Sequence, residues 1–350
     1  MSRSSPQGVS ADQMRVSVVI PVFNHALWLK DAVTSALAQS EVDEILLIED
    51  GSSDHSLERC EELASTDPRV VLLRHPNGEN RGAGASRNLG IRRATGPLVA
   101  FLDADDLMLP KRFQRTIGVL SEFPDTDGVY EAVGYRFDSR DALRLHMSDG
   151  RELLTTMSRV VEPDRLFWEQ SPVGDAGYCN TDGWTFRRDF LMQKLLFNEH
   201  LGLHEDTDFF IRASIAGVMR PGELSQPVAT RRLHAANRIS SPRSEGDRFE
   251  TFQAMWIASA IWALRSGHGQ HGRHLALLAF RGWLSGPLAL GGYRRRLLSA
   301  VRLLRGELSE FGPSLVPRIL AKHFVEIASL PFVGLFRRLV MRAGAAPSIS

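Results

Sequence analysis

The sequence predicts an α/β fold with a doubly wound, mostly parallel sheet, helices on both of its faces and a helical C-terminal extension. Short β-branched runs alternate with helical patterns three times before a fourth apolar run, Leu98 to Leu102. This alternation is typical of strands joined by right-handed helical crossovers. Two of the runs end in acid-rich turns, at Asp50 and Asp103. Parallel strands bring such turns to one edge of a sheet, where open α/β sheets bind ligands.

The expected elements follow the chain in a regular order. Apolar runs predict buried strands at 17–22, 44–48, 70–73 and 98–102. Helical spacing predicts helices at 27–37, 57–64 and 85–94, from near Pro110, and at 251–264 and 275–284. Asn24 is a plausible cap for the first helix, and Gly51 permits a sharp turn after the second strand.

The composition is that of an ordinary soluble globular protein, with 43% apolar and 24% charged residues among 350. Cys60 and Cys179 are the only cysteines, too few for a disulfide framework, so a reducing compartment is expected. Residues 1–15 are polar and are expected to be flexible, without a signal peptide. No uninterrupted apolar run reaches the roughly 18 residues of a membrane span, so none is expected.

Charge is distributed unevenly along the chain. Residues 265–350 hold 13 Lys and Arg against 3 Asp and Glu, whereas the preceding residues hold 29 against 38. The tail combines apolar helical patterns with arginine clusters such as Arg294 to Arg296. Such segments either bind an anionic membrane surface or pack as a bundle with a solvated basic face, and the sequence leaves both open. Nucleic acid is not an expected partner, because no aromatic residues for base stacking are interleaved with the arginines.

The stretch from Val99 to Asp106 places three carboxylates directly after a buried strand. Clustered carboxylates repel one another unless a positive charge lies between them. A hard divalent cation takes oxygen ligands of this kind. The alternative is an acidic turn that caps the helix expected from near Pro110, and the eight residues alone do not choose between the two.

The glycine-rich loop at residues 77–84 does not fit the dinucleotide-binding fingerprint and lacks the Lys-Ser/Thr of a P-loop. Neither a nicotinamide nucleotide nor NTPase activity is therefore expected. A glycine-rich helix start beside Arg81 and Arg87 still suits an anionic group.

Four segments, in order, resemble family 2 glycosyltransferases: Val19–Asn24, Glu49–Asp54, Gly84–Asn88 and Phe101–Asp106. The resemblance implies the Rossmann-like A-type glycosyltransferase (GT-A) fold over residues 16–240. A nucleotide-binding half, 16–106, would be followed by an acceptor half, 107–240, and then by a helical region, 241–350. Glu49 stands where the family usually has aspartate, a departure that keeps the charge.

The resemblance also implies a role for each matching residue. The nucleotide-sugar donor would be bound by Pro21, Phe23, Asn24, Asp50, Ser52, Arg81, Arg87, Asn88 and Asp103. The Asp-x-Asp pair, Asp103 and Asp105, would bind Mn2+ or Mg2+ together with His234 of an Arg-x-x-His segment. Arg238 and Ser240 follow His234 at spacings that suit contacts with the diphosphate.

Two segments of the acceptor half allow two interpretations each. Trp184 either lines the sugar pocket, as the resemblance implies, or lies in the core of a short strand. Glu205 and Asp206 either occupy a helix N-terminus favoured by the helix dipole or supply the catalytic base. The resemblance favours the base, with Asp206 as the first candidate and Glu205 as the second.

The sequence thus predicts an inverting glycosyltransferase. A sugar would move from a nucleotide-diphosphate sugar, with a UDP-sugar expected, to a hydroxyl of a saccharide or lipid-linked saccharide in bacterial cell-surface polysaccharide or glycoconjugate synthesis. We expect a cytoplasmic location at the inner face of the plasma membrane. Alternatives are a nucleotidyltransferase acting on sugar phosphates, which would need a lysine-rich phosphate loop, and a non-catalytic nucleotide-sugar-binding protein, which would lack the base or metal ligands. A processive synthase would show membrane spans and a Gln-x-x-Arg-Trp segment.

Overall fold

The computed structural model describes residues 14–138, 140–148, 153–233 and 245–285. The chain divides into two compact units, Met1–Pro242 and Arg243–Ser350. In the second unit, α9 (Glu245–Arg265) and α10 (Gly269–Ser285) pack against each other. Within the described ranges, no helix is both long and apolar enough to cross a membrane. Residues 286–350, which hold most of the basic tail, lie outside the described residues.

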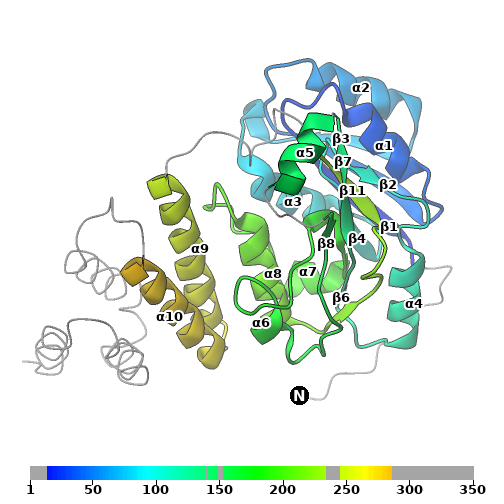
Figure 1. Cartoon of the computed structure of the whole chain (residues 1–350). Helices are drawn as coiled ribbons and strands as arrows, with labels where there is room; N and C mark the ends of the chain where they lie inside the picture. The colour runs from blue at the N-terminus through cyan, green and yellow to red at the C-terminus, as the bar shows by residue number, and fades with distance from the viewer. Residues whose placement is uncertain (1–13, 139, 149–152, 234–244, 286–350) are drawn as a thin grey trace, which may run out of the picture. The chain divides into compact units, whose positions relative to one another are not determined.

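The first unit is built on a seven-stranded sheet in the order β10-β6-β9-β4-β1-β2-β3 (Figure 1). Its strands are β1 (Val16–Val22), β2 (Val42–Glu49), β3 (Val70–Arg74), β4 (Leu98–Phe101), β6 (Gly128–Tyr130), β9 (Trp184–Arg187) and β10 (Met219–Pro221). The pairs β1–β2, β1–β4, β2–β3 and β6–β10 are parallel. β9 runs antiparallel to both β4 and β6. The mostly parallel sheet is therefore confirmed, and the inserted antiparallel strand is the feature that the alternation did not indicate.

A second, four-stranded sheet has the order β5-β11-β7-β8. Its strands are β5 (Leu107–Met108), β7 (Val133–Phe137), β8 (Leu154–Thr155) and β11 (Ala229–Leu233). β11 pairs in parallel with β7 and antiparallel with β5. Because β5 directly follows the acid-rich turn after β4, the turn connects the seven-stranded sheet to this second sheet.

The described helices of the first unit connect these strands. They are α1 (Leu29–Leu37), α2 (Ser56–Thr66), α3 (Gly82–Arg93), α4 (Gln114–Glu122), α5 (Arg140–Ser148), α6 (Leu166–Glu169), α7 (Arg188–Lys194) and α8 (Glu205–Ala216), with the 3-10 turns η2 (Pro76–Gly78) and η3 (Thr181–Gly183). The cap predicted at Asn24 is wrong, because α1 begins only after Trp28. Asn24 has a left-handed φ of 58°, and its Oδ1 accepts from the Ser53 amide at 2.8 Å.

Helices cover both faces of the seven-stranded sheet, as predicted. On one face, side chains such as Val18 and Ile20 pack with Leu29 and Val33 of α1 in the main core. On the other face, α3 approaches β1 so closely that a Cβ at Gly90 would lie 2.3 Å from Val19 Cγ1. Glycine is therefore required at this helix position. The two packed faces place the carboxyl ends of β1, β2 and β4 at one edge.

Candidate active site

The acidic side chains at the end of β2 are hydrogen-bonded to other groups of the protein. Asp50 is buried, and its two carboxylate oxygens accept from the amides of Arg81 at 2.7 Å and Gly82 at 2.9 Å. These amides open α3, so Asp50 satisfies backbone donors that a helix start leaves unpaired. Gly51, at φ 73°, follows where a Cβ would lie 2.8 Å from the amide nitrogen of Asn80. The sharp turn predicted at Gly51 is present, and it brings the glycine-rich loop onto the end of β2.

Glu49 uses its extra length to connect two strands. Its Oε1 accepts from the Ser52 amide at 2.6 Å, and its Oε2 accepts from Arg74 Nε at 2.9 Å. Glu49 and Arg74 are register partners at the ends of β2 and β3. The departure from aspartate at this position therefore serves an ion pair across the strand ends.

Several residues predicted to bind the nucleotide-sugar donor lie around this turn at the surface. Phe23 is 45% exposed, Asn24 and Arg81 are exposed, and Ser52 is partly exposed. The Asn24 amide donates to Ser52 Oγ at 3.1 Å, which joins the turns after β1 and β2. Pro21 is partly buried at the end of β1. An exposed aromatic ring and exposed polar groups on the turns after β1 and β2 are of the kind that bind a nucleoside.

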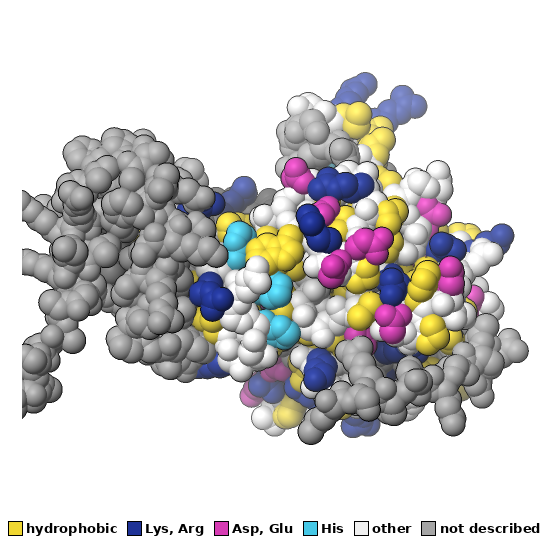
Figure 2. Space-filling model, turned by 90° about the horizontal axis from the view of Figure 1, so that it is seen from below, with side chains coloured by type: hydrophobic (Ala, Val, Ile, Leu, Met, Phe, Trp, Pro, Cys, Tyr) yellow, Lys and Arg dark blue, Asp and Glu magenta, His cyan; other side chains and the backbone are white. Residues whose placement is uncertain are grey.

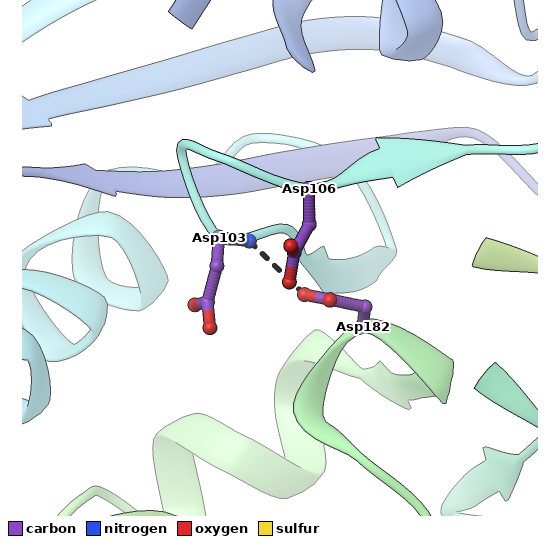
Figure 3. Close-up of side chains that lie close together, drawn as sticks. All are labelled: Asp103, Asp106 and Asp182. Carbon is purple, nitrogen blue, oxygen red and sulfur yellow. Dashed lines mark hydrogen bonds between the residues drawn. The ribbon is translucent and has the colours of Figure 1, made fainter. Parts of the chain in front are cut away.

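Three carboxyl groups meet beyond the end of β4 (Figure 3). Asp103 and Asp106 lie in the turn after β4, and Asp182 lies in η3, directly before β9. One oxygen from each carboxyl group lies within 4.8 Å of the other two. The Asp103 amide donates to Asp182 Oδ1 at 3.0 Å. The antiparallel pairing of β9 with β4 brings η3 to this turn.

The three carboxyl groups differ in exposure and in charge. Burial and the charge of Asp103 raise the pKa of Asp182 to about 7. Burial, Asp182 and Asp105 raise the pKa of Asp106 well above its usual range. The Asp103 side chain is 33% exposed and accepts from Arg87 Nη2 at 2.7 Å. The cluster thus has one member open to solvent and two enclosed behind it.

These donors fit a hard divalent cation such as Mn2+ or Mg2+. Three carboxylate oxygens are the ligand type that such cations take. Asp182 Oδ2 is buried, and the carboxyl groups of Asp182 and Asp106 contact each other directly, which requires a shared proton when no cation lies between them. A buried carboxylate oxygen among like charges is stabilised by a cation. The cluster that can hold a metal is therefore Asp103, Asp106 and Asp182, where the motif indicated Asp103 and Asp105.

Asp105 lies outside this cluster. The turn that contains it is held by hydrogen bonds from Arg232 of β11. The Asp105 carbonyl accepts from Arg232 Nε at 3.1 Å, and Asp106 Oδ1 accepts from the Arg232 amide at 2.7 Å. The buried Arg232 guanidinium also pairs with Asp31 at 3.2 Å and Asp138 at 3.3 Å. Arg232 therefore fixes the conformation of the acid-rich turn, a role that the sequence pattern did not reveal. A metal contact by Asp105 stays a prediction.

Asp182 is supported from behind by a fully buried ion pair that sequence reasoning missed. Arg112 Nε and Nη2 donate to the Asp182 carbonyl at 3.1 and 2.9 Å, and Nη1 pairs with Glu131 at 2.5 Å. Glu131 also accepts from Thr116 Oγ1 and from the Glu223 amide. Both charged side chains have no solvent exposure, and their hydrogen bonds compensate for the lost hydration. No spacing rule marks such a pair in a sequence.

The first turn of α8 places the two candidate bases in different surroundings. Glu205 is 4% exposed, and its Oε1 lies 3.6 Å from Arg87 Nη1. Asp206 is partly exposed, and its Oδ1 accepts from the Thr207 amide at 2.7 Å. A substrate hydroxyl can therefore reach Asp206 more easily than Glu205.

The structure places Asn88 and Trp184 in the protein interior. Asn88 is 1% exposed; its Nδ2 donates to the Phe197 carbonyl at 2.9 Å, and its Oδ1 accepts from the Phe197 amide at 2.7 Å. Trp184 is 2% exposed and stacks on Phe210 at 4.5 Å between ring centroids. Its Nε1 donates to the Cys179 carbonyl. The expectation for Asn88 is therefore corrected, because Asn88 fixes the backbone at Phe197. Trp184 takes the second of its two interpretations, a core position in the short strand β9.

Three predicted residues, His234, Arg238 and Ser240, lie outside the described residues. On the face of the molecule in Figure 2, acidic and basic side chains alternate among the described residues rather than gathering into one basic patch.

The fold resembles that of S. aureus TarS residues 1–349, solved in complex with UDP-GlcNAc, with a TM-score of 0.59 and 19% identity over 88% of this chain and 83% of that chain. Residues 17–193, just over half of the chain, match Glycosyl transferase family 2. The chain therefore belongs to Glycosyl transferase family 2 and is a glycosyltransferase. The predicted family, fold class and enzyme class are confirmed.

Two curated relatives align with much of the chain. An uncharacterised glycosyltransferase of Nostoc is 29% identical over 232 residues, which cover 66% of this chain and 68% of the relative. The succinoglycan biosynthesis protein ExoU of Rhizobium meliloti is 29% identical over 248 residues, 64% of this chain and 68% of the relative. The match spans only 17% of an uncharacterised glycosyltransferase of Rickettsia felis and 42% of one of Haemophilus influenzae.

Proposed function

We propose that this protein is an inverting glycosyltransferase that moves a sugar from a nucleotide-diphosphate sugar to an acceptor hydroxyl. One observation carries the proposal: Arg87 pairs with Asp103, at the donor side, and with Glu205, the neighbour of the accessible Asp206. A candidate base therefore lies close to the carboxylates that would face the donor's diphosphate. A single displacement requires the base and the leaving group on opposite sides of the sugar, and these carboxylates and Asp206 come from different elements.

Asp206 acts as the general base in this mechanism. It takes the proton of the acceptor hydroxyl as the oxygen attacks the anomeric carbon. The new carbon–oxygen bond forms as the bond to the diphosphate breaks, so the anomeric configuration inverts and the nucleoside diphosphate leaves. Asp103, Asp106 and Asp182 would hold Mn2+ or Mg2+, which supplies positive charge for the leaving diphosphate.

The donor and the acceptor are proposed by class. TarS is described in complex with UDP-GlcNAc, and the exposed Phe23 ring suits a nucleoside; we therefore propose a UDP-sugar. A relative's name refers to succinoglycan biosynthesis, which supports a saccharide or lipid-linked saccharide acceptor in bacterial polysaccharide or glycoconjugate synthesis.

Donor binding and turnover of Asp206→Asn test the base. A panel of UDP-, GDP- and dTDP-sugars with Mn2+ first identifies the donor by calorimetry and by release of the nucleoside diphosphate. We expect Asp206→Asn to bind that donor like the wild type while transfer falls by about two to four orders of magnitude. Asp125→Asn, a change at an exposed surface ion pair, is the matched control and should transfer normally. Equal losses of donor affinity and transfer in Asp206→Asn would contradict the assignment.

We further propose that the basic tail attaches the protein to the anionic inner face of the plasma membrane. Each basic residue near such a surface contributes on the order of 1 kcal/mol, so the excess of Lys and Arg in residues 265–350 suffices for reversible binding. Co-sedimentation of the full chain with phosphatidylglycerol vesicles should be strong at low salt and weaken as salt is added. Failure to bind at low salt would contradict the proposal and favour the bundle interpretation.

A further inference from the structure

Arg87 lies in the interior of the first unit, at a point where three elements meet. It comes from α3, Asp103 follows β4, and Glu205 opens α8. The Arg87 side chain is 5% exposed, so its guanidinium has little surface to offer a donor phosphate. Its neighbour Phe197 packs against the guanidinium, with 5.3 Å between Arg87 Cζ and the ring centroid. The electrostatic partners of Arg87 are therefore carboxylates of the protein itself.

The two carboxylates hold Arg87 unequally. Nη2 donates to Asp103 at 2.7 Å, which is a strong charge-assisted hydrogen bond. Nη1 lies 3.6 Å from Glu205 Oε1, and neither Nη1 nor Nε has a hydrogen-bond partner among the described residues. Burial lowers the pKa of Arg87, but Asp103, Glu205 and Asp206 raise it more, so the group keeps its charge. The Arg87 guanidinium thus lies between Asp103, on the proposed donor side, and Glu205, which is next to the proposed base.

The segment that leads into α8 is attached to α3 beside Arg87. Asn88 binds the backbone of Phe197, and Arg92 pairs with Glu199 at 3.6 Å. A Cβ at Gly84 would lie 3.5 Å from Phe197 and 3.7 Å from Glu205 Cγ, so the first turn of α3 is in ordinary contact range of this segment. The position of the first turn of α8 relative to the donor side therefore depends on α3.

We propose that Arg87 is a positioning residue that fixes the first turn of α8, with its base Asp206, relative to Asp103. This inference rests on the proposed function. The single positive charge of Arg87 lies between the negative charges of Asp103 and Glu205, holds the two carboxylates near each other and so sets the distance between the donor side and the base. Displacement of a catalytic group by about 1 Å can cost about a hundredfold in rate.

Arg87→Met and Arg87→Lys test the proposal. In Arg87→Met, kcat should fall by about a hundredfold while the Kd of the donor, measured by calorimetry, changes by less than about threefold. Arg87→Lys keeps the charge without the planar guanidinium and should recover at least about tenfold of the lost kcat. Hydrogen exchange of the amides at residues 204–208 should rise in Arg87→Met, because the first turn of α8 loses its cation.

The matched control is Arg187→Met, which removes another largely enclosed arginine. Arg187 Nε donates to the Thr126 carbonyl at 2.8 Å, and Arg187 pairs with Leu98 at the amino end of β4, the edge away from the carboxylates. This variant should unfold at a lower temperature with unchanged kcat and unchanged exchange at residues 204–208.

Three outcomes would overturn the proposal. Donor affinity that falls in proportion to turnover would make Arg87 a donor-binding residue. Unchanged kcat per folded molecule, or exchange at 204–208 that does not respond to Arg87→Met, would leave Arg87 a structural residue only. If Arg87→Met does not fold, the cycle of Arg87→Lys with Glu205→Gln decides: additive losses of kcat overturn the coupling, and non-additive losses support it. A wild type without turnover on every donor refutes the proposed function instead, and the exchange measurement still tests Arg87.

Discussion

The acid-rich turns after β2 and β4 lie at the same edge of one sheet but handle their charge in opposite ways. Asp50, after β2, is bound by two amides at the start of α3. Asp106 and Asp182, beyond β4, accept only one backbone amide each within the described ranges, from Arg232 and from Asp103, and their carboxyl groups also face each other. An acid whose charge is met by peptide groups supports the fold, whereas acids that face each other leave a place for a cation. Sequence motifs mark both turns equally, and only the surroundings separate their roles.

The largest expected effect comes from Asp182. Asp182→Asn removes one of three carboxylates, so Mn2+-dependent turnover should fall by at least about a hundredfold. Titration of turnover with Mn2+ measures the change, and Glu49→Gln, which alters the other turn, should keep the wild-type metal dependence. If Asp182→Asn keeps full metal dependence while Asp105→Ala loses it, the Asp-x-Asp pair, and not the cluster, binds the ion.

The opposite effect is expected for Asp50. Asp50→Ala leaves the partly buried amides of Arg81 and Gly82 without their carboxylate partner, so the free energy of unfolding should fall by about 2 kcal/mol. Urea unfolding measures the loss, and the Mn2+ dependence of the remaining activity should be unchanged. Unchanged stability with weakened donor binding would make Asp50 a ligand contact, and the contrast between the turns would then be wrong.

The thermal stability of the metal-free protein should depend on pH through the carboxyl cluster beyond β4. Because the pKa of Asp182 is raised to about 7, the folded chain keeps a proton that the unfolded chain releases near pH 4. Without metal, this group stabilises the fold at low pH, and its contribution is lost as pH rises from about 4 to 7. A pKa raised from 3.8 to about 7 corresponds to about 4 kcal/mol, and each kcal/mol shifts the Tm by about 2–4 °C, so the Tm of the metal-free protein should fall by on the order of 10 °C over this range relative to Asp182→Asn. Parallel Tm curves for the two proteins would contradict the raised pKa.

The smallest effect is expected for Glu49→Asp, which restores the residue usual in the family. The shorter side chain should lose its ion pair with Arg74. Because the Arg74 side chain is 44% exposed, the free energy of unfolding should change by less than about 1 kcal/mol. Thermal unfolding measures the change, with Glu49→Gln for comparison. A larger loss would mean that the Ser52 amide also depends on the reach of glutamate.

The N-terminal sheet and the turn at Asp103 were predictable because each rests on local pattern: an apolar run, a glycine or a cluster of acids within a few residues. Asp182 was not, because it reaches the site only through β9, which pairs antiparallel with β4 from eighty residues further along the chain. For Arg87, the sequence identified the residue but not its partner. Its motif was recognised, but whether a guanidinium binds a phosphate or a neighbouring carboxylate depends on Glu205 and Asp103, which folding brings to it.

β9 lies between β4 and β6 in the sheet, although it comes from outside the nucleotide-binding half, residues 16–106. Leu98–Phe101 is apolar and fully buried, and β9 supplies the hydrogen bonds along one side of it. A fragment ending at residue 106 would expose this strand as a flat hydrophobic edge, which is a template for pairing with other chains. The nucleotide-binding half expressed alone should therefore aggregate, whereas co-expression with residues 107–240 would cover the edge and keep it monomeric.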